Sequence, residues 1–478
     1  MTEKVRVRFA PSPTGNMHIG GLRTALFNWL FARHAAGTFL VRIEDTDKER
    51  SEEKYVQALF EALAWVGIES DEPVIFQSQR QKDYHEVVNK LILEKKAYRC
   101  FCTPKDLEDR VRKAGITDEH YSYDGFCRNR VIKEQETDLY GIRFSIPESV
   151  TEIKVNDLIR GTVTFDRNQL DDFIIFRSDG TPMYNFAVVI DDAYSRITHI
   201  IRGEEHLSNT PKQILLYEAC GYKIPQFAHI PMILAPDGSK LSKRYGAVDV
   251  LSYRQSGYLP DALINYIARL GWSFGDQEQF SKQELIAHFT LEGVGKKGAI
   301  FDIQKLEWLN GVYVRNVTQA DLMVAIEKTD AALHFQTLAQ NYSLEKISEA
   351  LRLYQPRVKT VVQLAQEVIE LFKQPAFYKQ DEILHHIHKD QTEFLLEKAV
   401  HLLMTIDTFS LIEISSVLKS LCEEESIKLV SLAQPLRIAL TGGVTSPGVF
   451  ELLALLGKEE SCARIKAFLI FLDHEKKS

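Results

Sequence analysis

The sequence predicts an α/β protein: a parallel-sheet domain that is split by an α+β insertion and followed by an all-helical carboxyl-terminal region. Three observations support this fold class. A strand, a glycine-containing turn and a helix follow one another between residues 5 and 36. A second strand and helix continue the alternation that builds parallel sheets. From Gln319 onward no strong strand alternation appears, and amphipathic helices run to Phe471.

The opening segment has the order expected of a phosphate-binding turn. Pro11 and Pro13 end the apolar strand 5–10, and a helix runs through 22–36. Three glycines allow the backbone to approach a ligand: Gly15, Gly20 and Gly21. Free N–H groups at the helix start favour an anion, and the His18 ring can donate to phosphate oxygens. The same order also occurs in turns that only connect packed elements, so the motif alone leaves both interpretations open.

The next elements extend this start into a Rossmann-like sheet. A strand over 38–43 precedes a helix over about 51–66, for which Ser51 is the expected N-cap. Ligands of such sheets collect at the carboxyl ends of the strands. Arg8 and Glu44 both fall near such ends, so we expect them close to a bound ligand.

The pattern changes in the middle of the chain, which indicates an insertion before the parallel sheet resumes. The expected elements are a helix over 80–96, β-like runs over 141–146 and 162–166, a strand over 197–201, and helices over 210–220 and 261–270. The strand over 197–201 leads directly into Arg202.

Length and composition limit the class of protein. At 478 residues the chain exceeds one usual core, so roughly two to four domains are expected. Its 45% hydrophobic and 26% charged residues are ordinary globular values. The chain shows neither an export signal at its start nor an apolar run of about 18 residues, so we expect a cytoplasmic protein that does not enter a membrane. A formal net charge of −8 means that nucleic-acid binding would depend on local basic surfaces.

Three of the six cysteines have the spacing of a metal site. Cys100 and Cys102 form a Cys-x-Cys pair and Cys127 follows, while Tyr123 or His120 is available as a fourth ligand. Three cysteines in a cytosolic insertion are equally compatible with buried thiols, so the spacing leaves zinc open.

Three segments together resemble one family. RFAPSPTGNMHIGG at 8–21 resembles the HIGH signature of class I aminoacyl-tRNA synthetases in its glutamyl-specific form, and KLSKR at 240–244 resembles the KMSKS loop. VRIEDTD at 41–47 agrees with both. Their order and spacing, over nearly the whole chain, identify a resemblance to the bacterial-type glutamyl-tRNA synthetases.

This resemblance implies ATP-dependent ligation of L-glutamate to the 3′ end of tRNA(Glu) through glutamyl-adenylate, with release of AMP and pyrophosphate. His18, Lys240 and Lys243 are the implied catalytic residues, which stabilise charge on the phosphates. ATP, accompanied by Mg²⁺, is expected to contact the following residues: Gly15, His18, Gly20, Gly21, Glu205, His206, Lys240, Ser242, Lys243 and Arg244. For His206 a structural role is a close alternative. The implied partners are tRNA(Glu), L-glutamate and ATP, and the family implies a monomer.

Glutamate brings two carboxylates and one ammonium group into the site. By the resemblance, Arg8 and Arg202 grip the carboxylates, Glu44 takes the ammonium group, and Ser12 and Tyr184 add hydrogen bonds. We assign the side-chain carboxylate to Arg8 and leave the reverse assignment open. The alternative for either arginine is a structural ion pair with one of four acids: Asp45, Asp47, Glu204 or Glu205.

The resemblance also suggests a metal set and an RNA-binding region. Some relatives hold zinc with a Cys-x-Cys and a later Cys-x-His, but Asn129 breaks that set here. Another family pattern, Tyr-x-x-x-Cys, matches Tyr123 and Cys127, so the predicted zinc ligands are Cys100, Cys102, Tyr123 and Cys127. Arg357 and Arg437 are the predicted tRNA-binding residues of an anticodon-binding region.

The resulting domain prediction has six ranges. These are a first catalytic half (1–75), an acceptor-stem-binding insertion (76–185), a second catalytic half with the KLSKR loop (186–250), a stem-contact helical domain (251–318), and two anticodon-binding subdomains (319–374 and 375–478). Other functions remain possible alternatives: charging of tRNA(Gln) by the same chemistry, glutamylation of a modified base in tRNA(Asp), or a catalytically silent tRNA-binding paralogue. The tail beyond about residue 320 argues against the second, and His18, Lys240 and Lys243 argue against the third.

Overall fold

The computed structural model describes residues 3–46, 51–113, 123–130, 139–241, 249–375, 378 and 389–477. The chain divides into two compact units, Met1–Ser252 with Leu263–Ile303, and Tyr253–Ala262 with Gln304–Ser478. The six predicted ranges are finer than this division and stay predictions. None of the helices in the described ranges has the length and apolar character needed to cross a membrane.

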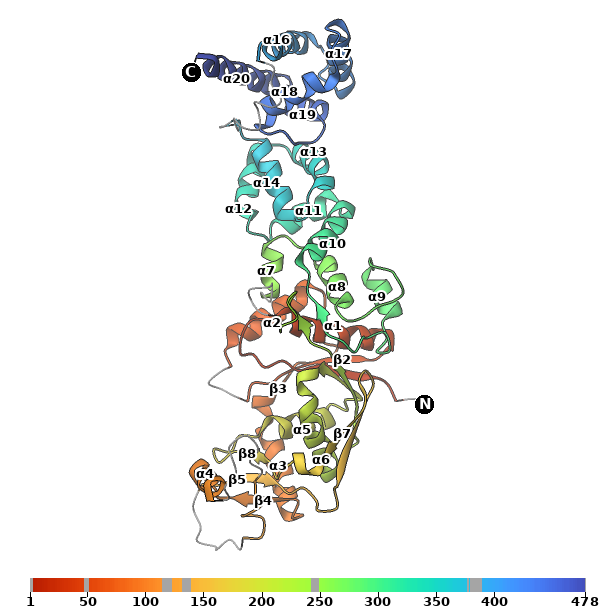
Figure 1. Cartoon of the computed structure of the whole chain (residues 1–478), viewed down its shortest axis with the longest axis vertical. Coiled ribbons are helices and arrows are strands. Elements are labelled where there is room, and N and C mark those ends of the chain that lie inside the picture. Colours follow the sequence, from red (N-terminus) through yellow and green to blue (C-terminus); the bar gives the residue numbers. More distant parts are fainter. Residues whose placement is uncertain are drawn as a thin grey trace. The chain divides into compact units, whose positions relative to one another are not determined.

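A parallel sheet forms the centre of the first unit (Figure 1). Its strands are β1 (Arg6–Phe9), β2 (Thr38–Ile43), β3 (Ile75–Phe76), β6 (Glu152–Asp157), β9 (His199–Gly203) and β10 (Gln226–Ile230). β1, β2 and β3 pair in parallel, as do β9, β10 and β6. Thr198 N donates to Arg6 O at 2.9 Å, which places β9 beside β1. The resulting order β3-β2-β1-β9-β10-β6 confirms the predicted Rossmann-like class.

The inner strands of the sheet are buried almost throughout, whereas β6 at its edge alternates exposed and buried residues. β2 is buried at all six positions, including Arg42. The helices of this part are α1 (Ile19–His34), α2 (Glu53–Trp65), α5 (Tyr184–Tyr194) and α6 (Thr210–Cys220). The predicted Ser51 cap is wrong: the N-cap of α2 is Glu52, and no side chain caps the helix. The observed β9 begins and ends two residues later than the predicted strand, so Arg202 lies within it and does not follow it.

The insertion contains an antiparallel sheet of β4 (Ala97–Cys100), β5 (Gly141–Phe144) and β8 (Ile174–Phe176). Its other elements are η1 (Gln77–Arg80), α3 (Gln81–Leu93), α4 (Pro104–Lys113), β7 (Gly161–Asp166) and η3 (Arg167–Gln169). β7 forms an antiparallel hairpin with β6. Because β6 also pairs with β10, part of the predicted insertion range contributes a strand to the central sheet.

The first unit continues past the central sheet. These elements are η4 (Glu204–Asn209), β11 (Ile233–Leu234), β12 (Ala299–Ile300) and α9 (Lys282–His288). β11 and β12 form a short parallel pair. Three helices span the divisions between the units: α7 (Val250–Gln255), α8 (Pro260–Arg269) and α10 (Ile303–Asn316).

The described residues of the second unit contain helices and no strand, as predicted (Figure 1). They are α11 (Gln319–Ile326), α12 (Ala332–Asn341), α13 (Leu344–Tyr354), η6 (Gln355–Arg357), α14 (Val361–Leu371), α16 (Lys389–Thr405), α17 (Leu411–Glu424), α18 (Leu429–Thr441), α19 (Val449–Leu456) and α20 (Lys458–Lys477). The predicted break at Gly442 is confirmed, because this residue ends α18 with φ +73°.

Candidate active site

One cavity of about 1240 Å³ in the first unit is lined by the ends of β1, β2 and β9 and by the start of α1. Every described residue that we predicted to bind glutamate or ATP lines it. These residues are Arg8, Ser12, Gly15, His18, Gly20, Gly21, Glu44, Tyr184, Arg202, Glu205, His206 and Lys240. Residues more than 200 positions apart in the sequence therefore share one space, as ligand binding at the strand ends requires.

His18 is the N-cap of α1 and holds its ring by a local hydrogen bond. Its Nδ1 accepts from Gly21 N at 3.2 Å, so in the neutral ring the proton is on Nε2, which remains a donor. Partial burial lowers the pKa of His18, and the neighbouring Lys240 ammonium lowers it further. A Cβ on Gly20 would lie 3.0 Å from His18 Cε1, so glycine leaves room for this ring position.

Ser242, Lys243 and Arg244 lie outside the described residues. The described residues on both sides of them line the cavity: Lys240 and Leu241 before, Asp249 after. Leu241 N donates to Ile233 O at 3.2 Å. Asp249 accepts from Asn16 Nδ2 at 2.9 Å. Leu241 is thus held beside β11, and Asp249 is held beside the turn that precedes α1.

A buried chain of charges supports the floor of the cavity. Arg8 Nε donates to Asp192 Oδ1 at 3.0 Å, and the guanidinium of Arg42 contacts the same carboxylate. Arg42 Nη2 also lies 3.2 Å from Glu44 Oε1. Burial would raise the pKa of Asp192, but the two guanidinium groups hold it below its usual range. The carboxylate partner of Arg8 is therefore Asp192, which was not among the four acids considered from the sequence.

Arg202 differs because no carboxylate pairs with it among the described residues. Its Nε donates to His229 Nε2 at 3.1 Å, and its Nη2 donates to Thr210 Oγ1 at 2.9 Å and to His206 O at 3.3 Å. Nη1 is buried and has no partner within the described part of the chain. Burial lowers the pKa of Arg202. A buried guanidinium with one free nitrogen favours an anionic ligand.

Glu44, Tyr184 and His206 complete the wall around Arg202. Burial raises the pKa of Glu44, although Arg42 and Arg8 oppose this rise. The Tyr184 hydroxyl lies 3.3 Å from His206 Nδ1. Burial lowers the pKa of His206 to about 4, and the Arg202 charge contributes to the shift. The wall therefore carries a neutral imidazole beside an arginine and a carboxyl group.

The three cysteines of the insertion lie together. The sulfur atoms of Cys100, Cys102 and Cys127 are within 4.8 Å of one another, and Cys102 Sγ lies 3.5 Å from Cys127 Sγ. The Tyr123 hydroxyl lies 3.5 Å from Cys100 Sγ and 3.9 Å from Cys102 Sγ. Arg143 Nε donates to Cys100 Sγ at 3.3 Å, which stabilises a thiolate. Three sulfur atoms this close together could hold a soft metal ion. His120, the other sequence candidate for a fourth ligand, lies outside the described residues.

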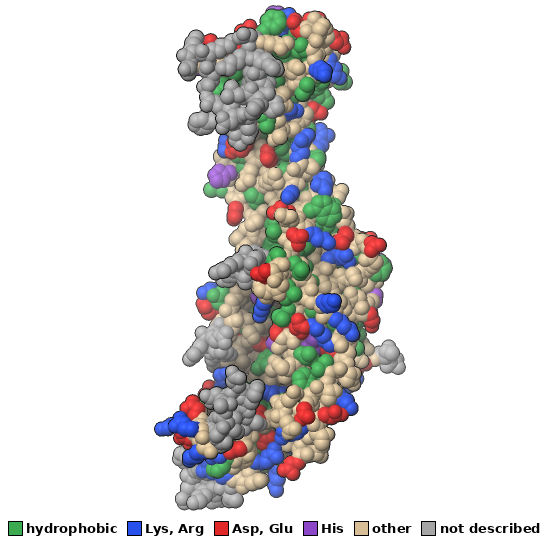
Figure 2. Space-filling model, viewed as in Figure 1, with side chains coloured by type: hydrophobic (Ala, Val, Ile, Leu, Met, Phe, Trp, Pro, Cys, Tyr) green, Lys and Arg blue, Asp and Glu red, His purple; other side chains and the backbone are tan. Residues whose placement is uncertain are grey.

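The two predicted tRNA-binding residues lie near each other in the second unit. Arg357 ends η6 and is exposed, whereas Arg437 in α18 is half-buried and donates from Nε to Ser446 Oγ at 2.9 Å. Burial lowers the pKa of Arg437, and the Arg357 charge adds to this effect. On the face shown in Figure 2, Lys and Arg side chains are interspersed with Asp and Glu. RNA contact on this face would therefore rest on local groups of Lys and Arg.

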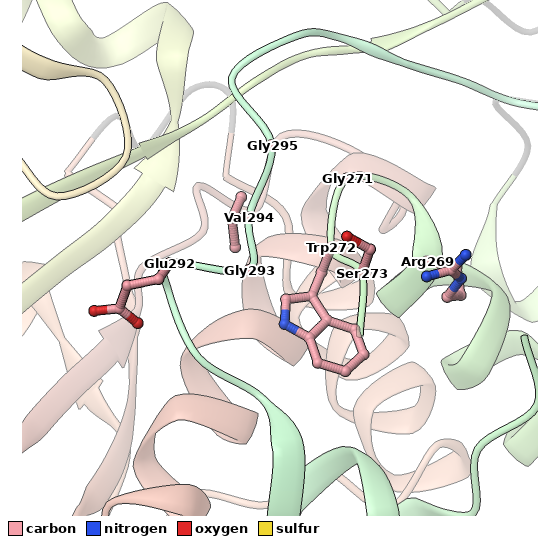
Figure 3. A pocket seen from close by; sticks show the side chains of 8 residues that line it. All are labelled: Arg269, Gly271, Trp272, Ser273, Glu292, Gly293, Val294 and Gly295. Atoms are coloured by element: carbon pink, nitrogen blue, oxygen red, sulfur yellow. The ribbon is translucent and has the colours of Figure 1, made fainter. Parts of the chain in front are cut away.

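A second, smaller hollow of about 450 Å³ lies in the first unit (Figure 3). It is formed by Arg269 and by two glycine-containing segments, 271–273 and 292–295. Trp272 is 2% exposed, and its Nε1 has no partner among the described residues. None of the predicted site residues lines this hollow, so it is separate from the candidate active site.

Sequence reasoning missed the residues that hold the predicted ones. Asp192 is the buried partner of Arg8, Arg42 binds the same carboxylate, and His229 is the partner of Arg202. A signal was available for Arg42, because an arginine within the apolar strand TFLVRI has the same pattern that singled out Arg8. Asp191 and Asp192 follow the apolar run FAVVI in the same way.

Comparisons with known proteins agree with this geometry. The model of the class I tRNA synthetase (E and Q) catalytic domain matches residues 4–308, and an anticodon binding domain model matches 327–469. A glutamate–tRNA ligase of Caldanaerobacter subterraneus is 44% identical and covers 100% of both chains. One from Thermodesulfovibrio yellowstonii is 43% identical and covers 97% of this chain and 98% of its own.

A solved structure gives the same result. The crystal structure of a glutamate tRNA ligase from Elizabethkingia meningosepticum, in complex with its amino acid, superposes with a TM-score of 0.88. Its identity is 33%, and the match covers 98% of this chain and 100% of the other. A Rossmann-like domain with this cavity, followed by an anticodon-binding domain, defines a class I aminoacyl-tRNA synthetase. Within that class, the chain belongs to the glutamyl-tRNA synthetase family.

Proposed function

We propose that the chain ligates L-glutamate to tRNA(Glu) in two steps, with glutamyl-adenylate as the intermediate and ATP with Mg²⁺ as the cosubstrate. The observation that carries this proposal is the shared cavity. A buried arginine without a carboxylate partner, Arg202, lines the same space as His18 and Lys240. Arg202 suits a carboxylate of an amino acid that brings two of them, and His18 and Lys240 suit phosphates. A silent tRNA-binding paralogue is not favoured, since the related chains are ligases over their full length.

Positioning and charge stabilisation supply the chemistry of the first step. The α-carboxylate of glutamate attacks the α-phosphorus of ATP in line, and pyrophosphate leaves. Arg8 and Arg202 hold the carboxylates and Glu44 receives the ammonium group, which would return the pKa of this buried acid toward its usual value. Ser12 and Tyr184 add hydrogen bonds at the wall of the cavity. Arg202 offers Nη1 for one carboxylate, while Arg8 keeps its bond to Asp192.

Phosphates meet the other end of the cavity. His18 donates from Nε2, and the N–H groups at the start of α1 face the same anion, with Gly15, Gly20 and Gly21 leaving the backbone accessible. Lys240, and Lys243 by its place in KLSKR, add positive charge as pyrophosphate departs. Glu205 and His206 lie at the adenosine side by the same proposal, and Ser242 and Arg244 complete the loop.

The proposal includes one structural Zn²⁺ held by Cys100, Cys102, Tyr123 and Cys127, on the support of the sulfur and hydroxyl distances. It also includes Arg357 and Arg437 as contacts to the anticodon part of tRNA. The cytoplasmic location and the monomeric state stay predictions.

A charging assay tests the proposed function. Purified chain, labelled glutamate and ATP are incubated with tRNA(Glu), tRNA(Gln) or tRNA(Asp), and tRNA(Glu) should be charged. Lys240→Ala should lower kcat by roughly 100-fold, the usual loss for a group that stabilises the leaving phosphates. Lys223→Ala is the matched control, because Lys223 is exposed and pairs with Glu3. Failure to charge any of the three tRNAs would reject the function. Charging of tRNA(Gln) or tRNA(Asp) alone would show that this tRNA, and not tRNA(Glu), is the substrate.

A further inference from the structure

We propose that Asp157 and His229 are positioning residues for Arg202: a chain of hydrogen bonds from the insertion holds its guanidinium so that Nη1 is left for a glutamate carboxylate. This inference rests on the proposed function and names a specificity device within it.

Strand pairing brings the three residues together. Arg202 on β9 and His229 on β10 are direct partners in the parallel register. Asp157 is the last residue of β6, the neighbouring strand on the other side of β10. The side chains of His229 and Asp157 are fully buried. The three residues therefore lie on three adjacent strands, and their side chains interact where little solvent reaches them.

The hydrogen bonds define where the protons are. His229 Nε2 must accept, because Arg202 Nε donates to it at 3.1 Å. The ring proton is then on Nδ1, which donates to Asp157 Oδ2 at 2.6 Å. Burial lowers the pKa of His229, which agrees with a neutral ring. His229 thus connects a carboxylate to a guanidinium without carrying charge itself.

Asp157 is itself fixed by the backbone. Its Oδ1 accepts from Ile159 N at 3.0 Å and from Arg160 N at 2.8 Å, and Oδ2 accepts from His229 N at 3.0 Å. Burial would raise the pKa of this carboxyl, but the bonds from His229 and the backbone keep it below its usual range. An ionised carboxylate in a fixed position in turn sets the tautomer and the orientation of His229.

The opposite edge of Arg202 is held as well. Nη2 donates to Thr210 Oγ1 at 2.9 Å and to His206 O at 3.3 Å. With Nε and Nη2 occupied, Nη1 is the nitrogen left without a partner among the described residues. Because Arg202 lines the cavity and its buried Nη1 lacks an acceptor, a ligand carboxylate bound against Arg202 would supply the missing acceptor.

Two substitutions at His229 separate its two hydrogen bonds. In His229→Gln the amide reaches the place of Nε2, so the acceptor for Arg202 is kept. In His229→Asn the shorter amide lies near the place of Nδ1, so the bond to Asp157 is kept and the acceptor for Arg202 is lost. Ile230→Val, a buried change at the next position of β10, controls for loss of core volume.

We expect His229→Asn to raise the KM for glutamate roughly 10- to 100-fold, the range for loss of a hydrogen bond to a charged group. The KM for ATP should stay within about threefold, and His229→Gln and Ile230→Val should stay near wild type for both substrates. Asp157→Asn should imitate His229→Asn, because its amide would donate to Nδ1, move the ring proton to Nε2 and remove the acceptor for Arg202. This variant keeps the proposal testable if His229→Asn does not fold.

The outcomes distinguish the two proposals. If the wild type is active, either of two results overturns this inference alone. One is an equal glutamate KM for His229→Asn and His229→Gln. The other is an equal glutamate KM for Asp157→Asn and the wild type. An equal rise of the KM for ATP and for glutamate also overturns it, since that result indicates a general structural role. A wild type that does not ligate glutamate overturns the proposed function, and this inference with it.

Discussion

At the scale of single residues, buried charge decides what the cavity can bind. Arg8 and Arg42 share the carboxylate of Asp192, whereas Arg202 is held by a neutral imidazole, a hydroxyl and a carbonyl. Because a buried guanidinium without an anion is costly, the site as it stands favours a ligand that brings a carboxylate.

His18 combines two roles that can be separated by substitution. Asparagine is a good N-cap, so His18→Asn should keep the acceptor for Gly21 N but lose the Nε2 donor. We expect a loss of roughly 100- to 1000-fold in kcat with little change in unfolding free energy. His18→Ala should lose kcat similarly and also about 1 kcal/mol of stability through the missing cap. Steady-state charging and urea unfolding measure the two effects, and near-normal kcat for His18→Asn would contradict the phosphate role.

His206 makes stability depend on pH. Its pKa is about 4 in the folded chain because of burial and Arg202, with Arg8 and His229 adding to the shift and Glu205 opposing it. An unfolded histidine titrates near 6.5, so between about pH 6.5 and 4 the unfolded state binds more protons. Stability contributed by this group is therefore present above that window and falls as the pH is lowered through it.

The variant His206→Gln should lose less stability between pH 7 and pH 5 than wild type. The difference should be below about 1.4 kcal/mol per pH unit, which is the limit for one proton. Solvent screening lowers it further, because the side chain is 38% exposed. Urea unfolding at both pH values measures it, and parallel pH dependence of the two proteins would contradict the assigned shift.

At the scale of elements, the insertion takes part in the central sheet. β6 pairs with β10 and supplies Asp157, so the insertion is tied to the residues that hold Arg202. Its own sheet of β4, β5 and β8 carries Cys100, one of the three clustered cysteines. The insertion is therefore connected to the cavity through Asp157, and it also contains the cysteine cluster.

Metal analysis tests the zinc site proposed at these cysteines. We expect about one zinc per chain after a chelator wash, and Cys102→Ser should lower it to well below half and weaken the insertion, because structural zinc contributes folding free energy. Cys220→Ser is the control, since Cys220 lies in α6, outside the cluster. Stoichiometry near zero in a folded wild type, or equal zinc in the two variants, would remove the metal from the proposal.

At the scale of the whole molecule, the candidate active site and the two predicted anticodon contacts belong to different units. The cavity residues all belong to the first unit, and Arg357 and Arg437 belong to the second. With a net charge of −8, the chain attracts RNA only through local groups of positive charge.

Arg357→Ala should raise the KM for tRNA roughly tenfold and reduce the slope of binding against log salt by about one. The KM values for glutamate and ATP should not change, because Arg357 does not line the cavity. Arg352→Ala is the matched control, as Arg352 is an exposed arginine of α13 that pairs with Glu349. Equal tRNA affinity of the two variants would exclude Arg357 as a contact.

The sequence by itself determined the elements and the residues with local signals. Strand, turn and helix order follow from apolar periodicity, glycine and proline, which act over a few positions. These signals identified the α/β class and the helical tail, whereas the roles of the cavity residues that we named came mainly from the resemblance of three motifs to a known family. They failed for the N-cap of α2, which is Glu52 and not Ser51.

Only the tertiary structure decided which charges meet. Arg8 and Asp192 are 184 positions apart, Arg42 and Asp192 are 150 apart, and His229 and Asp157 are 72 apart. Periodicity carries no information about such pairs, because they form only when the strands associate and α5, which carries Asp192, packs against them. The physical difference between a paired Arg8 and an Arg202 with a free nitrogen therefore appears only in the folded chain.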